Sequence, residues 1–153
     1  KDYLALVYGG FNQQEGEIRA PLGRHPVERK KVAVVVKKGR QAITRWRLKR
    51  QWDAVVALLL VTIETGRTHQ IRVHFSHINH PVVGDQVYGG GKKRARSLKS
   101  KELQDLLLGV NRQMLHAWRL AFNHPVSGGR LSFEAPLPRD FKGLLERLQK
   151  GCD

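Results

Sequence analysis

The chain has 153 residues, of which 41% are hydrophobic and 27% charged; this is an ordinary composition for one globular domain and excludes wholesale disorder. Its 28 Lys and Arg residues against 13 Asp and Glu residues give a formal net charge of +15, which favours a polyanionic partner, nucleic acid first of all. The single cysteine, Cys152, excludes an intrachain disulfide and a cysteine-based zinc site, and no apolar run approaches the ~18 residues of a membrane span.

The first part of the chain favours short strands that are separated by turns. We predict strands over residues 3–8, 17–22, 31–36, 42–50 and 54–64. The run 42–50 alternates strictly, with the basic residues Arg45, Arg47 and Lys49 on one side, which predicts one buried and one solvated face. The run 54–64 is apolar on both faces, so we expect it in the middle of the sheet.

After residue 64 the apolar period changes from that of a strand to that of a helix. Ile71, Phe75 and Ile78 follow at helical spacing, and Thr68 is the candidate N-cap of this helix. We expect the helix to end near residue 79, because a proline follows at position 81.

The second half of the chain mixes helices with one more hairpin. We predict, in order, a turn-rich loop over 82–91, a mobile basic arm over 92–96, a short helix over 99–108, and hairpin strands over 113–123 and 130–134. A final helix is expected after Pro138, with Asp140 as its N-cap and an apolar stripe of Phe141, Leu144, Leu145 and Leu148. Strands outnumber helices, so the predicted class is α+β, with a mixed, mostly antiparallel sheet and a few flanking helices.

The Gly-Arg-Thr turn before the helix at 71–78 is a candidate anion site. A helix start presents free backbone N–H groups and the positive end of the helix dipole. Arg67 and Arg72 add guanidinium groups where the dipole disfavours a cation, so we expect a phosphate or carboxylate partner. The alternative is that Arg72 makes an ordinary surface ion pair with a nearby carboxylate.

The histidines of this segment favour packing or capping over metal binding. His74 and His77 share a helical face, which suits a metal ligand pair. However, His80 falls beside a proline at the helix end, no cysteine is near, and the chain has no His-Glu-x-x-His pattern. We therefore expect no metal site.

Three basic clusters together favour a composite RNA groove. Arg45, Arg47 and Lys49 project from one strand face, the turns at 29–31 and 37–38 adjoin them, and 92–96 is a further cluster. The alternative for each cluster by itself is a solvated surface.

Ordered motifs along nearly the whole chain resemble the RluA-type family of RNA pseudouridine synthases. The strongest is the run from Thr65 to His74, Thr-Gly-Arg-Thr-His-Gln-Ile-Arg-Val-His, followed by His-Ile-Asn-His-Pro-Val-Val-Gly-Asp at 77–85. Lys-Asp-Tyr at 1–3 and Glu-Ala-Pro-Leu-Pro at 134–138 fit the beginning and the end of the pattern. Within the family the chain is most similar to the type D enzymes of large-subunit ribosomal RNA.

The resemblance implies an isomerase that converts uridine to pseudouridine in RNA without a cofactor. It implies that Tyr3 lies against the target base, that Arg72 ion-pairs with a catalytic aspartate, and that Ile71 and Leu115 line the apolar part of the pocket. The residues assigned to RNA binding are Arg24, Arg29, Lys30, Arg45, Arg47, Arg67, Thr68, His69, Gln70, Lys92, Lys93 and Arg94.

The chain departs from the family pattern at the catalytic aspartate, which the family carries in an upstream Arg-Leu-Asp motif that is absent here. The aspartates of the chain, which stand in other contexts, are Asp2, Asp53, Asp85, Asp105, Asp140 and Asp153. Asp85 matches a structural turn of the family. We therefore expect residues 1–153 to be a partial catalytic domain that lacks the upstream segment, is inactive alone, and leaves Arg72 facing an anion that the chain does not supply.

The alternative is a basic RNA-binding module that keeps the fold and does no chemistry. An Arg-Leu-Asp motif upstream in the full-length gene would favour the enzyme. In either case we expect a cytoplasmic monomer whose partner is RNA, in the first place ribosomal RNA, with no membrane or metal partner.

Overall fold

The computed structural model describes residues 1–152, and of Cys152 the backbone only. The Cys152 side chain and Asp153 lie outside the described part of the chain. None of the helices within it is long and apolar enough to cross a membrane.

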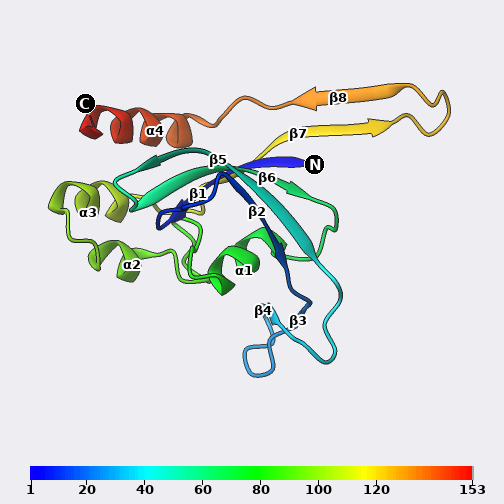
Figure 1. Ribbon diagram of the computed structural model, residues 1–153, viewed down its shortest axis with the longest axis horizontal. Helices are drawn as coiled ribbons and strands as arrows, with labels where there is room; N and C mark the ends of the chain where they lie inside the picture. Colours follow the sequence, from blue (N-terminus) through cyan, green and yellow to red (C-terminus); the bar gives the residue numbers. More distant parts are fainter. Residues whose placement is uncertain (153) are drawn as a thin grey trace.

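A six-stranded antiparallel sheet in the order β2-β5-β6-β1-β7-β8 forms the body of the molecule (Figure 1). Its strands are β1 (Asp2–Tyr8), β2 (Glu15–Arg19), β5 (Ile43–Trp52), β6 (Val56–Ile63), β7 (Leu115–Asn123) and β8 (Arg130–Glu134). A separate two-stranded sheet joins β3 (Leu22–Arg24) to β4 (Val32–Val34). The helices are α1 (Gln70–His77), α2 (Lys92–Arg96), α3 (Lys101–Leu108) and α4 (Arg139–Cys152). The predicted α+β class is confirmed.

Each face of the sheet has its own core, because successive side chains of a strand point to opposite faces. Leu6 and Tyr8 of β1 belong to the cluster that packs under α3 and α4. Ala5 and Val7 belong to the cluster that packs under α1. The predicted alternation of β5 and the interior position of β6 are both confirmed, since Trp46 is buried between exposed arginines and β6 has a strand on each side.

One predicted strand is in fact two, and Pro21 is the reason. The run 17–22 ends as a strand of the main sheet at Arg19, because proline has no N–H to continue the ladder. The carbonyl of Pro21 instead accepts a hydrogen bond from Val35 N at 2.9 Å. The chain thereby turns out of the main sheet and enters the β3–β4 hairpin, which projects below it (Figure 1).

The basic segment 92–96 is a helix, and the prediction of a mobile arm was wrong. Ala95 is fully buried in the core under α3 and α4, which anchors α2 to the body. The guanidinium of Arg94 lies 5.6 Å from the centre of the Tyr8 ring and donates to Asn79 Oδ1 at 3.2 Å. Lys92 and Lys93 are both exposed.

The predicted helix caps were also wrong, although both helices exist. The N-cap of α1 is His69, in a left-handed conformation with φ 54° and no side-chain cap bond, in place of Thr68. Asp140 lies inside α4, and its carboxylate binds Arg112 at 2.7 Å. The apolar stripe of α4 is confirmed by the burial of Phe141, Leu144 and Leu148.

Replacement of two glycines by alanine is expected to change the free energy of unfolding in opposite directions. Gly84 has φ +84°, and a Cβ there would collide with the Arg112 carbonyl, so Gly84→Ala is expected to lower the free energy of unfolding by about 1–3 kcal/mol. Gly143 lies inside α4, and a Cβ added there would have no neighbouring atom within 4 Å, so Gly143→Ala is expected to raise it by about 0.5–1 kcal/mol. Urea denaturation of both variants checks the pair, and equal effects would contradict it.

Candidate active site and nucleic-acid interface

Three residues expected at the pocket share one apolar cluster on the α1 face of the sheet. Ile71, in the first turn of α1, is 4% exposed within this cluster, and the partly buried Tyr3 and Leu115 pack against it. The strand register explains the placement, because Ala117 pairs with Tyr3 and Leu115 pairs with Ala5 on the same edge of β1. The fold therefore brings together residues that are more than a hundred positions apart in the sequence.

Arg72 has a carboxylate partner within the chain, which corrects the expectation that its anion is missing. Arg72 Nε and Nη2 donate to the two carboxylate oxygens of Asp85 at 2.8 and 3.0 Å. The Asp85 side chain is fully buried and that of Arg72 is 12% exposed. Hydrogen bonding to Asp85 raises the pKa of the Arg72 guanidinium, so Arg72 stays charged.

Asp85 reaches Arg72 because the chain turns sharply after the buried Val83. The left-handed Gly84 makes the turn, and Asp85 Oδ1 then accepts hydrogen bonds from Val87 N and Tyr88 N, both at 3.1 Å. The Tyr88 ring lies 4.9 Å from the Arg72 guanidinium. Asp85 thus organises its own turn and fixes Arg72 at the same time, in keeping with the structural turn expected for it.

The start of α1 is tied to the β3–β4 hairpin through Tyr88. The Tyr88 hydroxyl accepts from Val32 N at 3.0 Å and lies 2.7 Å from His69 Nδ1. Burial lowers the pKa of His69, and the nearby positive charge of Arg72 lowers it further. His69 is therefore neutral at pH 7 and holds the helix start in place.

Gln70 is buried and has a structural role, and its assignment to RNA binding stays a prediction. It is 3% exposed, and Oε1 accepts from Arg67 N at 3.1 Å and from Thr65 Oγ1 at 2.7 Å. Its amide nitrogen donates to Ile43 O at 2.9 Å and to Thr44 Oγ1 at 3.0 Å. The backbone N–H of Arg67, expected to be open to an anion, is thereby already bound.

His74 has the packing role that the sequence favoured. It is fully buried, with Nδ1 2.8 Å from Thr44 Oγ1 and Nε2 2.9 Å from Ala20 O. These contacts join α1 to β5 and to the exit from β2. No group of three or more His, Cys, Asp or Glu side chains in the described part of the chain is placed to hold a metal ion.

Stability should fall at acid pH because of His74. Burial lowers its pKa below the ordinary value of 6.5, so below pH 6.5 the unfolded chain binds a proton that the folded chain does not. The contribution of His74 to the free energy of unfolding is expected to be independent of pH above pH 6.5. Below pH 6.5 the free energy of unfolding is expected to decrease as the pH falls. His69 adds to the same slope. Denaturant unfolding between pH 8 and 5 should show a smaller slope for His74→Gln, and an unchanged slope would contradict the assignment.

A basic cavity of about 570 Å³ lies next to the helix that carries Arg72 and is lined by β3, the turn after it and the turn before α1. Five residues assigned to RNA binding meet here: Arg24, Arg29, Lys30, Arg67 and Thr68. Lys31 and Arg40 also line it, and no Asp or Glu is among the described residues of its wall. We call this cavity the basic basin. Arg40 was missed in the sequence because nothing local marks it; its backbone pairs with Leu22 beside β3.

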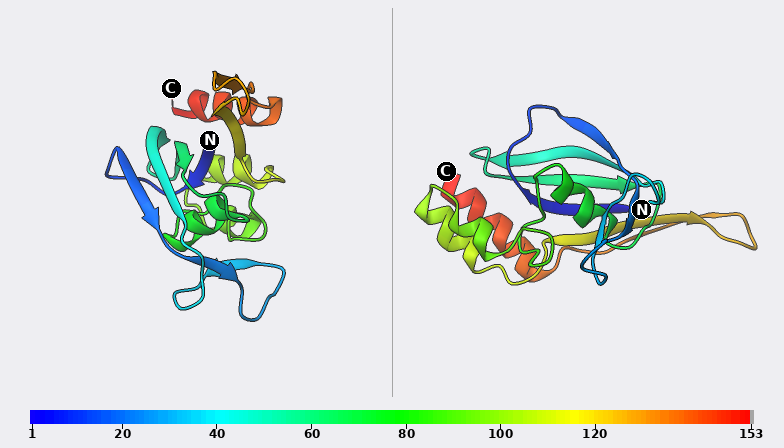
Figure 2. Two further views of the ribbon diagram at one scale, coloured as in Figure 1. Left: turned by 90° about the vertical axis from the view of Figure 1, so that its right-hand side faces the viewer. Right: turned by 90° about the horizontal axis from the view of Figure 1, so that it is seen from below.

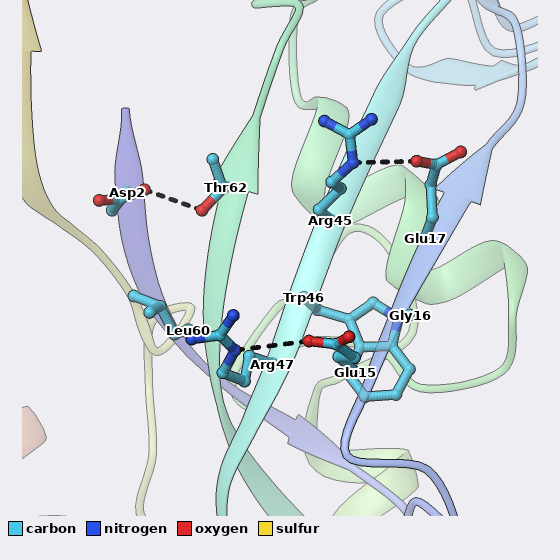
Figure 3. Close-up of a pocket in the computed structure, with 9 residues that line it drawn as sticks. All are labelled: Asp2, Glu15, Gly16, Glu17, Arg45, Trp46, Arg47, Leu60 and Thr62. Atoms are coloured by element: carbon cyan, nitrogen blue, oxygen red, sulfur yellow. Dashed lines mark hydrogen bonds and ion pairs between the residues drawn. The ribbon is translucent and has the colours of Figure 1, made fainter.

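The basic clusters of the predicted composite groove do not all line the basic basin, and the composite groove stays a prediction. Arg45 and Arg47 line a different cavity, of about 580 Å³, which Trp46 also lines (Figure 3). Each faces a carboxylate of β2: Arg45 Nε lies 3.0 Å from Glu17 Oε2, and Arg47 Nε lies 3.6 Å from Glu15 Oε2. Lys92, Lys93 and Arg94 do not line the basic basin either.

Comparison with known proteins agrees with the geometry. A family model described as RNA pseudouridylate synthase matches residues 1–77. The chain belongs to this family. It is 43% identical over 149 residues to ribosomal large subunit pseudouridine synthase D of Nitrosomonas europaea, covering 97% of this chain and 41% of the relative. It is 45% identical over 148 residues to the synthase D of Pseudomonas aeruginosa, covering 97% of this chain and 45% of the relative.

Solved structures of the synthase fold match nearly the whole chain. The human RNA pseudouridylate synthase domain containing 1 superposes with a TM-score of 0.68 at 25% identity, covering 97% of this chain and 65% of that structure. The human domain containing 4 superposes with a TM-score of 0.69 at 23% identity, covering 97% and 62%. The chain therefore spans less than half of these curated relatives and less than two thirds of these structures.

Proposed function

We propose that this chain forms part of an enzyme that isomerises uridine to pseudouridine in large-subunit ribosomal RNA. The observation that carries the proposal is the meeting of Tyr3, Ile71 and Leu115 in one cluster beside the Arg72 helix, in a chain whose relatives are named for this reaction. In the reaction the N1–C1′ bond breaks, the C5–C1′ bond forms, the hydrogen on C5 leaves as a proton, and N1 takes up a proton. No oxidant, reductant or cofactor is needed for this balance.

In this proposal the residues of the chain bind and orient, and a carboxylate from outside the 153 residues acts at the ribose. The Tyr3 ring lies against the uracil once the base leaves the RNA stack, and Ile71 and Leu115 line the pocket. Asp85 uses Nε and Nη2 of Arg72, which leaves further guanidinium N–H donors for a second carboxylate. Asp85 is then a positioning residue that aims Arg72 at the incoming aspartate. The 153 residues alone should not catalyse the isomerisation of uridine.

The experiment combines the chain with a polypeptide that supplies the proposed catalytic carboxylate. We define the complementing polypeptide as the part of the Pseudomonas aeruginosa synthase D that this chain does not span, which includes the Arg-Leu-Asp motif expected of the family. Co-expression of the two, followed by measurement of tritium release from ribosomal RNA labelled at uridine C5, is expected to show turnover. RNA binding without tritium release from the purified complex would favour the alternative, a non-catalytic RNA-binding module.

We also propose that the basic basin holds the RNA backbone. Its cations are Arg24, Arg29, Lys30, Lys31, Arg40 and Arg67, and a wall without carboxylates among its described residues suits a row of phosphates. The cytoplasm is the location that fits an enzyme of ribosomal RNA, and a monomer suffices for one such site.

Charge reversal in the basic basin should weaken RNA binding. Arg24→Glu combined with Arg29→Glu is expected to lower RNA affinity about tenfold or more and to reduce the slope of log affinity against log salt by about 2. The control, Lys99→Glu with Lys101→Glu, changes the net charge equally at exposed positions near α3. Filter binding over a salt series measures both, and an equal loss in the control would contradict a localised site.

A further inference from the structure

Tyr88 packs between the β3–β4 hairpin and α1. Its side chain is buried in one apolar cluster with Leu22 of β3 and Val73 of α1. Val32 and Val34 of β4 pack against the same cluster. The hairpin is not part of the main sheet, and it lies beside α1 instead (Figure 1 and Figure 2). The position of this hairpin relative to α1 therefore depends on Tyr88.

The ring and the backbone of Tyr88 are both held at Arg72. The centre of the ring lies 4.9 Å from the Arg72 guanidinium. The Tyr88 backbone N–H donates to Asp85 Oδ1 at 3.1 Å, and the same oxygen accepts a hydrogen bond from Arg72 Nη2 at 3.0 Å. A displacement of Tyr88 therefore reaches the guanidinium through a shared carboxylate oxygen and a cation–π contact.

The Tyr88 hydroxyl joins this ring to the β3–β4 hairpin. It accepts a hydrogen bond from Val32 N at 3.0 Å and lies 2.7 Å from His69 Nδ1. Val32 pairs with Arg24 across the hairpin, and it directly follows Lys31. Arg24 and Lys31 both line the basic basin. One hydroxyl thus connects the backbone that carries two cations of the basin with the ring that contacts the guanidinium.

RNA binding is expected to change how firmly the hairpin packs, because the basic basin is a set of like charges. Its described wall holds six Lys and Arg residues and no carboxylate, so these side chains repel one another in the absence of RNA. Phosphates neutralise the cations and remove this repulsion. A separate two-stranded sheet has little stability of its own, so it responds readily to such a change.

We propose that Tyr88 is a positioning residue that couples RNA binding in the basic basin to the orientation of Arg72. This inference rests on the proposed function and explains how phosphates far from the target uridine raise the rate of the reaction. Their binding energy is used to hold the guanidinium in the orientation that receives the catalytic carboxylate. A basin that only increased affinity would lower KM and leave kcat unchanged.

The first test observes Arg72 directly in the full 153-residue chain and needs no turnover. Nuclear magnetic resonance of the chain with isotope-labelled arginine records the Nε–H signal that Arg72→Lys removes. The ligand is an RNA oligonucleotide without uridine, which supplies phosphates but no target base. It is expected to shift this signal in the wild type. Tyr88→Phe, which removes only the hydroxyl, should bind the oligonucleotide within about a factor of two of wild-type affinity and show a shift at least about threefold smaller.

The matched control is Tyr8→Phe, which also removes one buried hydroxyl. Tyr8 is 1% exposed, and its hydroxyl has no hydrogen-bond partner among the described residues. It belongs to the core cluster under α3 and α4, away from the hairpin. Tyr8→Phe should therefore keep the wild-type shift of the Arg72 signal and the wild-type kcat.

The second test measures turnover in the complex with the complementing polypeptide. Tyr88→Phe is expected to lower kcat for tritium release about tenfold and to leave KM within about a factor of two. Adding Arg24→Glu and Arg29→Glu to Tyr88→Phe should lower kcat at saturating RNA no further than the larger of the separate losses. Residues that act independently would instead give losses of kcat that multiply.

Four results would overturn the coupling. The first is an Arg72 signal that the oligonucleotide does not shift in the wild type, and the second is an equal shift in Tyr88→Phe, with both chains folded by circular dichroism. The third is a loss of kcat in Tyr8→Phe as large as that in Tyr88→Phe. The fourth is independent losses of kcat in the combined variant. A shift that depends on Tyr88, in a chain whose complex releases no tritium, would leave the coupling intact and refute the proposed function.

Discussion

Asp85→Ala is expected to lower the free energy of unfolding by about 3–5 kcal/mol, because it removes one partner of a buried ion pair. The Arg72 guanidinium, 12% exposed, would lose both hydrogen bonds from its Nε and Nη2 atoms. The backbone N–H groups of Val87 and Tyr88 would lose their acceptor as well. Urea denaturation followed by circular dichroism measures the change. Asp85→Asn keeps an acceptor oxygen for the turn and should fall between the alanine variant and the wild type.

The control for Asp85 is an aspartate in an exposed ion pair. Asp105 binds Lys101 one helical turn away at 3.0 Å, and its side chain is 60% exposed. Asp105→Ala is expected to cost less than about 1 kcal/mol, as exposed pairs of this kind usually do. Similar losses of unfolding free energy in Asp85→Ala and Asp105→Ala would show that burial of the Arg72–Asp85 pair does not increase its contribution to stability.

Tyr3→Ala is expected to reduce turnover on the order of a hundredfold in the complex with the complementing polypeptide, while RNA affinity stays within about a factor of two. The reason is that we propose that the ring orients the displaced base and that affinity comes from phosphate contacts in the basic basin. Tyr3→Phe keeps the ring and should retain most of the turnover. Single-turnover tritium release and filter binding measure the two quantities separately. Parallel losses of turnover and affinity in Tyr3→Ala would refute the assigned role.

The strands were predictable because their signals are local. The alternation in 42–50 and the apolar run 54–64 reflect the period of side chains along a strand, and both predictions were confirmed. The alternation of apolar side chains did not predict that the chain leaves the main sheet and forms the β3–β4 hairpin. That path depends on the Pro21 carbonyl, which accepts a hydrogen bond from the distant Val35 N. Ala95 similarly makes 92–96 helical by packing into a distant core, against its strongly basic sequence.

The sequence singled out candidate site residues but did not predict the residues that they contact. The resemblance singled out Tyr3, Arg72, Ile71 and Leu115, and their roles in catalysis stay predictions. The partner of Arg72 was missed because Asp85 reaches it only through the left-handed turn at Gly84. The burial of Gln70 was not predictable, because a polar residue in a conspicuous motif gives no local sign that it is buried; its hydrogen bonds all go to residues outside its own helix.

The measurement that tests the central claim most directly compares tritium release from uridine C5 in three preparations. These are the chain alone, the chain with the complementing polypeptide, and the chain with a complementing polypeptide whose Arg-Leu-Asp aspartate is changed to asparagine. We expect release from the second preparation only, because we propose that the 153 residues orient the base and that the catalytic carboxylate comes from the complementing polypeptide. Release by the chain alone, or undiminished release with the asparagine variant, would contradict the claim.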